Sequence, residues 1–121
     1  MTQTEKTKTY DLEERTFQFA KNTALFCKQL PKTISNREHV AQLIRASGSV
    51  GANYIEANES VSKKDFVFRI KICRKESKES AFWIRLIKDL NTADFNETSL
   101  VLLNEAVELK KIFSAILEKS K

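Results

Sequence analysis

Apolar residues recur every three or four positions along four stretches of this chain, which is the period of a helix with one buried face. Polar segments separate the stretches, and the first of these segments contains Pro31, which ends the preceding helix. The pattern predicts helices over about residues 12–29, 36–57, 63–90 and 98–119. Residues 1–10 lack the period, so we expect a flexible tail there and one helical domain over residues 11–121.

Each predicted helix carries a stripe of residues that we expect to face a shared core. In the first helix the stripe is Phe17, Ala20, Ala24, Cys27 and Leu30, widened by Phe19 and Phe26. In the second it is Val40, Leu43, Ile44, Ser47, Val50, Gly51, Tyr54 and Ile55. In the third it is Phe66, Ile70, Cys73, Ser77, Ala81, Ile84 and Ile87. In the fourth it is Leu102, Leu103, Ala106, Leu109, Phe113, Ile116 and Leu117.

Two of the helix starts carry residues that cap helices. Ser35 is followed three positions later by Glu38, which is the spacing of a capping box. Ser62 is expected to cap the third helix, with Asp65 near the positive end of the helix dipole. The links between these long helices are short, and short links favour antiparallel neighbours. The sequence therefore predicts an all-α fold, an antiparallel up-down-up-down four-helix bundle.

The composition excludes most other fold classes. The chain has 2 Gly and 1 Pro, where average usage would give roughly eight and six. A β-sandwich, a β-barrel or a glycine-rich nucleotide-binding fold needs many more turn residues. Both glycines lie in the small-residue tract 46–52 inside the second helix, where each costs about 1 kcal/mol relative to Ala. We expect close approach of another backbone to compensate, because the G-x-x-x-x-G-K pattern of a phosphate-binding loop is absent.

The net charge of +5 is concentrated in one part of the chain. Residues 60–90 carry nine basic and four acidic side chains, so their excess of five equals the charge of the whole protein. On the third helix the basic residues Lys71, Arg74, Lys78 and Arg85 cluster on one side, and like charges four positions apart repel. Such a stripe can attract a polyanion, and the alternative is an ordinary solvated helix face.

A second group on the third helix is apolar and rich in aromatic side chains. It comprises Phe68, Ile72, Phe82, Trp83, Leu86 and Leu90, and it lies away from the predicted core stripe. Left exposed on a monomer, it would form a large apolar patch. Three explanations remain open, namely a subunit interface, wider burial within the same bundle beneath the N-terminal tail, and a platform on which nucleic-acid bases stack.

The sequence offers little support for catalysis, a metal or a cofactor. The chain has two cysteines, Cys27 and Cys73, and one histidine, His39, which are too few and too far apart for a zinc site. His39 lies at the start of the second helix, where we expect it to face solvent. The cysteines are expected to be buried thiols in a reducing compartment. No signal peptide and no stretch of 18 apolar residues is present, so we expect a cytoplasmic protein. Because the single histidine is not expected to lie beside a nucleophile, we expect that the protein is not an enzyme.

Four segments resemble a known family. They are residues 42–57 (QLIRASGSVGANYIEA), 62–66 (SKKDF), 75–79 (KESKE) and 82–86 (FWIRL). They resemble the four-helix-bundle proteins associated with intervening sequences in bacterial 23S ribosomal RNA genes. The resemblance implies a bundle that assembles into a ring, typically a homopentamer. It also implies a relation to the accessory proteins of diversity-generating retroelements, which are basic pentamers that bind nucleic acid and a reverse transcriptase.

The motif in the second helix also predicts contacts. Arg45, Ser49, Asn53 and Glu56 project from the side opposite the predicted core stripe. They are expected either to hydrogen-bond across a subunit interface or to form a solvated face with helix-favouring pairs. The subunit interface predicted from both helices comprises Arg45, Ser49, Asn53, Glu56, Phe68, Ile72, Phe82, Trp83 and Leu86. The leading functional hypothesis is an oligomer that binds RNA or DNA through Lys71, Arg74, Lys78 and Arg85, and the alternative is a protein-interaction scaffold.

Overall fold

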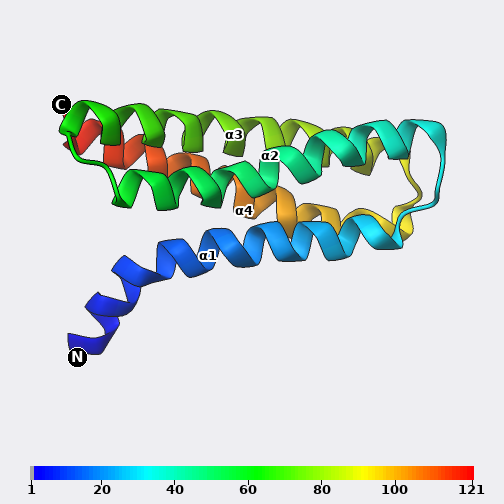
Figure 1. The fold of residues 1–121 in the computed structure, drawn as a ribbon. Helices are drawn as coiled ribbons and strands as arrows, with labels where there is room; N and C mark the ends of the chain where they lie inside the picture. The colour runs from blue at the N-terminus through cyan, green and yellow to red at the C-terminus, as the bar shows by residue number, and fades with distance from the viewer. Residues whose placement is uncertain (1) are drawn as a thin grey trace.

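The computed structural model describes the backbone of residues 2–121 and the side chains of residues 12–121. Its elements are α1 (Thr2–Gln29), α2 (Ile34–Asn58), α3 (Lys63–Leu90), a short 3₁₀ helix η1 (Ala93–Phe95) and α4 (Asn96–Lys119). Successive helices run in opposite directions and lie side by side (Figure 1). The predicted all-α, up-down-up-down four-helix bundle is thereby confirmed.

The third helix begins and ends where the sequence predicts. The hydroxyl of Ser62 accepts a hydrogen bond from the backbone N–H of Asp65 at 3.0 Å, which satisfies one of the free donors of the first turn. The predicted cap of the second helix is wrong, because the cap is Thr33 and not Ser35. Thr33 has extended backbone angles, and its hydroxyl accepts from the N–H of Asn36 at 3.1 Å, which places Ser35 inside the helix.

The first and last helices begin earlier than predicted. The helix assigned as α1 begins at Thr2 instead of near Leu12, and α4 begins at Asn96 instead of near Thr98. The flexible tail proposed for residues 1–10 falls outside the residues whose side chains the structure describes, and it stays a prediction.

The buried face of α1 differs from the predicted stripe. Its buried residues alternate in steps of four and three, and they are Leu12, Thr16, Phe19, Thr23, Phe26 and Leu30, with Cys27 beside them. Phe17 is 58% exposed, so its assignment to the core is wrong. In α2 the same error affects Ile44 and Ile55, which are exposed, while Ala46 and Ala57 are buried. The core follows the faces that meet a neighbouring helix, which a projection of a single helix cannot locate.

The stripes of α3 and α4 are close to the prediction. In α3 the fully buried members are Ile70, Cys73, Ser77, Ile84 and Ile87. In α4 the buried members are Leu102, Ala106, Leu109, Phe113 and Leu117. Phe66, Ala81, Leu103 and Ile116 are partly buried and pack against this core. The two helices pack extensively against each other, and α3 packs most extensively of all against α2.

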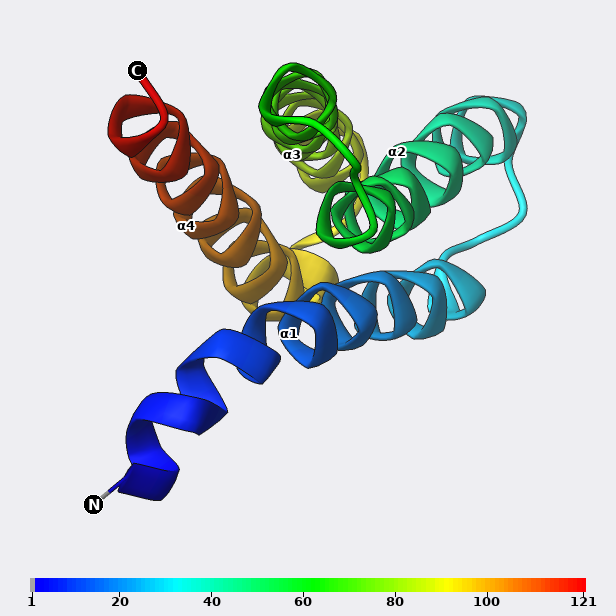
Figure 2. The same cartoon turned by 60° about the vertical axis from the view of Figure 1, so that its left-hand side comes forward.

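The first helix is attached less extensively than the others. Figure 2 shows α1 running beneath α2, and α1 contacts α2 more than α4. Its approach to α2 is close at Gly51, where an added Cβ would lie 3.0 Å from Oγ1 of Thr16. The expected close approach is thus confirmed at Gly51. At Gly48 no atom of the described residues lies within 4 Å of an added Cβ, so this glycine has no such explanation within the chain.

Candidate nucleic-acid interface

One side of α3 faces solvent along most of the helix. Its exposed residues recur every three or four positions and form a surface that we call the outer face of α3: Lys64, Phe68, Lys71, Lys75, Lys78, Phe82 and Arg85. Arg74 lies at the edge of this face and is partly buried. Three of the four predicted nucleic-acid contacts therefore belong to the outer face and the fourth borders it. Lys64 and Lys75 were missed, although both continue the same three-and-four spacing.

The cations on this face have no acidic partners among the described side chains. No ion pair joins Lys71, Arg74, Lys75, Lys78 or Arg85 to a carboxylate within residues 12–121. The acids Glu76 and Glu79 lie close to these cations along the helix, where they could offset part of this charge. They turn instead toward Arg45 on α2, which leaves the like charges on the outer face next to one another.

Two phenylalanines share this face with the cations. Phe68 is 56% and Phe82 57% exposed. The guanidinium of Arg69 lies 5.9 Å from the centroid of the Phe68 ring, and the Phe82 ring meets Trp83 edge to face at 4.9 Å. Lys63, Lys64, Val67, Phe68 and Lys71 line an open hollow of about 470 Å³ at the start of the helix.

The predicted aromatic group does not form one surface. Trp83 is partly buried against the core and stacks on His39, with ring centroids 5.7 Å apart. Ile72 and Leu86 are also partly buried, whereas Leu90 is exposed near the end of the helix. Of the three explanations, wider burial within the bundle thus applies to Trp83. Phe68 and Phe82 are exposed. The solvent-facing role expected for His39 is wrong, because its ring is stacked and its Nδ1 is buried.

The polar motif residues of α2 lie beside α3. The guanidinium of Arg45 donates to both carboxylate oxygens of Glu76 at 3.4 Å, and it also bonds Glu79. The side-chain oxygen of Asn53 accepts from Arg69 at 3.0 Å, while its amide donates to Ser49. We call this set, Arg45, Asn53, Arg69, Glu76 and Glu79, the α2–α3 seam.

The seam corrects the expected orientation of the motif. Arg45 and Asn53 do not project away from the chain's own helices, because both bond residues of α3. The Glu76 side chain is only 7% exposed, so Arg45 supplies the counter-charge for a buried carboxylate. The side chain of Glu56 is exposed. Contacts of Arg45, Ser49, Asn53 and Glu56 with a second subunit stay predictions.

Both cysteine thiols are buried, which makes them poor nucleophiles. Burial raises the pKa of Cys27 to about 11 and that of Cys73 to about 12, so both are neutral at physiological pH. The Cys73 thiol donates to the carbonyl of Val50 at 3.4 Å across the α2–α3 contact. No three His, Cys, Asp or Glu side chains within residues 12–121 are grouped so that they could hold a metal ion.

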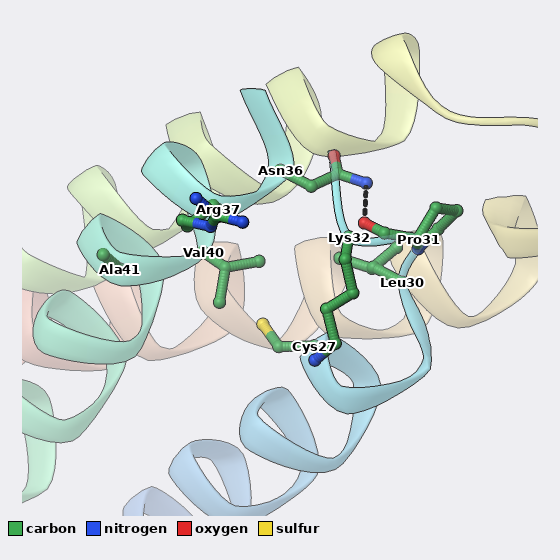
Figure 3. A pocket seen from close by; sticks show the side chains of 8 residues that line it. All are labelled: Cys27, Leu30, Pro31, Lys32, Asn36, Arg37, Val40 and Ala41. Carbon is green, nitrogen blue, oxygen red and sulfur yellow. Dashed lines mark hydrogen bonds between the residues drawn. The ribbon is translucent and has the colours of Figure 1, made fainter. Parts of the chain in front are cut away.

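A separate cavity of about 270 Å³ lies where α1 ends and α2 begins (Figure 3). It is lined by Cys27, Leu30, Pro31, Lys32, Asn36, Arg37, Val40 and Ala41. The Asn36 amide donates to the carbonyl of Pro31 and to Asn91 at the end of α3, which ties the link to the bundle. The Asn36 side chain in its lining is thus used in hydrogen bonds within the fold, and the Cys27 thiol is neutral. No pattern in the sequence predicts this cavity.

Comparisons with known proteins agree with this fold. A family model described as 23S rRNA-intervening sequence protein matches residues 8–115. The chain is also similar to a crystal structure of a protein of unknown function from the S23 ribosomal protein family of Bacteroides thetaiotaomicron. The two share 23% identity with a TM-score of 0.75, over 88% of this chain and 97% of that one. No curated protein matches. None of the helices in the described part of the chain has the length and apolar character of a membrane span.

Proposed function

The chain belongs to the 23S rRNA-intervening sequence protein family, and from this premise we propose that it is a non-enzymatic protein that binds nucleic acid through the outer face of α3. The observation that carries the proposal is that the cations of this face lack acidic partners among the described side chains. Lys71, Arg74, Lys78 and Arg85 pair with no carboxylate of the described side chains. A phosphate backbone would relieve their mutual repulsion and release its own counterions.

We also propose that several copies assemble, with a pentameric ring as the form that the family resemblance implies. The α1–α2 side supports assembly, because Phe17, Ile44 and Ile55 are exposed there and open space adjoins Gly48. Exposed apolar groups of this kind are typical of interfaces. A ring would repeat the basic outer face in each copy and so strengthen its field. Light scattering should give several times 13.9 kDa, whereas a monomer would contradict assembly.

Glu56 offers a local test of the predicted interface. Its side chain is exposed, so Glu56→Lys should leave the stability of the bundle within about 0.5 kcal/mol of the wild type. A fall in the mass in solution would support its place at a subunit contact. An unchanged mass would remove Glu56 from the predicted interface.

Nucleic-acid binding is tested with a matched pair of quadruple variants. In the first, Lys71, Arg74, Lys78 and Arg85 become Gln. In the second, the control, Lys21, Lys28, Lys32 and Lys119 become Gln, which removes the same charge from exposed positions outside α3. Fluorescence anisotropy with labelled RNA should show at least about tenfold weaker binding for the first variant only. Equal losses in the two variants would mean that overall charge, and not the outer face, governs binding.

A protein-interaction scaffold is the second candidate, and the exposed apolar residues of α1 and α2 favour it. If the ring binds a protein through Phe17, Ile44 and Ile55, RNA binding would be absent in the wild type as well as in both quadruple variants. A captured protein partner would then be released by Ile44→Lys and not by Lys78→Gln. Retention of the partner by Ile44→Lys would contradict the scaffold candidate.

A further inference from the structure

The outer face of α3 contains one arrangement twice. A cation stands four positions before each exposed phenylalanine and another stands three positions after it: Lys64, Phe68 and Lys71, then Lys78, Phe82 and Arg85. All six side chains are exposed. The two rings are fourteen positions apart, which is close to four helical turns, so they lie on the same side about 21 Å apart.

Each ring is supported on one side by a fixed neighbour. The guanidinium of Arg69 lies over the Phe68 ring and is itself held by the side-chain oxygen of Asn53 at 3.0 Å. The Phe82 ring meets the partly buried Trp83 edge to face. More than half of each phenylalanine nevertheless remains exposed. Two rings that are held in place and open to solvent lose little conformational freedom when a flat partner stacks on them.

We propose that the outer face of α3 binds single-stranded nucleic acid, with bases stacked on Phe68 and Phe82 and phosphates held by the cations between and beside them. This inference rests on the proposed nucleic-acid binding and specifies its form. Interleaved cations and exposed aromatic rings match both parts of a single strand, the charged backbone and the flat bases. At 3.4 Å per stacked nucleotide, the distance between the rings corresponds to at most about six nucleotides.

A duplex uses this surface less well. Its phosphates can contact Lys71, Lys75 and Lys78, but its bases are already stacked on one another and offer no free face to a phenyl ring. Removal of a ring should therefore weaken single-strand binding and leave duplex binding almost unchanged. This difference separates stacking from simple charge attraction.

A second copy of this chain is the rival occupant of the face. An interface here would take Lys71, Lys75 and Lys78 out of water beside the rings, and lysine is depleted from the centres of interfaces. The assembly proposed above draws on the exposed apolar residues of the α1–α2 side and does not require this face. The charge of the face therefore favours a polyanion over another copy.

The test uses the full-length protein with two labelled probes, a 12-nucleotide single-stranded RNA without self-complementarity and the duplex made from it. Phe68→Ala and Phe82→Ala should each weaken binding of the single strand about tenfold and of the duplex less than about twofold. Phe68→Trp and Phe82→Trp should retain binding because they keep an aromatic face. Leu100→Ala on α4 is the control, since Leu100 is 46% exposed and lies outside α3 and outside the proposed assembly surface.

The outcomes separate this inference from the proposal on which it rests. If the alanine variants bind both probes like the wild type while the Lys71, Arg74, Lys78 and Arg85 variant does not, the face binds by charge alone and the inference is wrong. If the alanine variants lower the mass in solution, the rings are subunit contacts and the inference is also wrong. If the wild type binds neither probe, the inference and the proposed function fail together.

Discussion

The two long sides of α3 differ in whether their charged side chains have partners. Toward α2, each charged side chain of the seam has a hydrogen-bond partner: Arg45 pairs with the carboxylates of Glu76 and Glu79, and Arg69 bonds the neutral side-chain oxygen of Asn53. On the outer face, Lys71, Lys75 and Lys78 have no acidic partner among the described side chains. The acids that could have neutralised the outer face are used inside the chain. The unpaired charges of the outer face are therefore available to an external polyanion, as the proposed function requires.

The largest expected difference between the two sides concerns packing. Ile84 is fully buried among the helices, so Ile84→Ala should lower the free energy of unfolding by about 3 kcal/mol. Phe82 lies two positions away but on the outer face, and Phe82→Ala should cost about 1 kcal/mol or less. Urea unfolding followed by circular dichroism measures both. Equal losses would mean that the outer face is part of the core.

Two buried thiols make the stability of the fold depend on pH in alkaline solution: Cys73 on the inner side of α3 and Cys27 on α1. Burial raises the pKa of the Cys73 and Cys27 thiols from 9.0 to about 12 and about 11. Below pH 8 both thiols are neutral in the folded and the unfolded chain, so they add no pH dependence to the free energy of unfolding in that range. From pH 9 toward 11 the unfolded chain loses these protons and the folded chain keeps them, so stability falls by about 1.4 kcal/mol per unit for each thiol.

The double variant Cys27→Ala/Cys73→Ala isolates this contribution. Between pH 8 and pH 10 the wild type should lose about 2.7 kcal/mol more stability than the double variant, whose other titrating groups are the same. Denaturant unfolding at the two pH values gives the difference. Parallel losses in the two proteins would show that the thiols titrate normally in the fold.

Arg45 and Lys78 provide the direct test of paired against unpaired charge. Arg45→Met leaves the Glu76 carboxylate buried without a counter-charge and should cost about 2 kcal/mol. Lys78→Met removes an exposed cation without a partner and should change stability by less than about 0.5 kcal/mol. Thermal unfolding of the two variants is sufficient. A tolerated Arg45→Met would mean that the seam does not hold the two helices together.

The smallest effect distinguishes the two glycines of α2. Gly48→Ala should stabilise the helix by about 1 kcal/mol, because no described atom lies within 4 Å of the new Cβ. Gly51→Ala should not show this stabilisation, because its Cβ would lie 3.0 Å from Oγ1 of Thr16. If Gly48→Ala instead lowers the mass in solution, the open space at this glycine is filled by a neighbouring subunit.

The sequence predicts more of α3 than of α1, and the reason is physical. In α3 the apolar residues Ile70, Cys73, Ile84 and Ile87 mark the buried face, Ser77 falls on it by spacing, and Ser62 caps the helix as expected. Only the buried Glu76 and Ser80 were missed there, because their polar side chains resemble solvent-facing residues. In α1 two positions of the buried stripe are Thr16 and Thr23, whose hydroxyls make them look polar although a helix can bury them. Phe17 looked like core because apolar character does not show which face meets α2.

The candidate site was predicted in part for a similar reason. Charge spacing alone was enough to group Lys71, Lys78 and Arg85. It could not show that Glu76 and Glu79 turn to Arg45, because partner choice depends on where α2 lies beside α3. It also could not separate neighbours in the chain, since Phe82 is exposed while Trp83 packs inward against the core and His39.

The salt dependence of RNA binding tests the central claim most directly. The slope of log affinity against log salt should be shallower by about three for the protein with Lys71, Arg74, Lys78 and Arg85 changed to Gln, since each lost phosphate contact removes about 0.7 on a single strand. The control with Lys21, Lys28, Lys32 and Lys119 changed to Gln should keep the wild-type slope. A slope unaltered by the α3 substitutions would contradict the account, because the phosphates would then lie elsewhere.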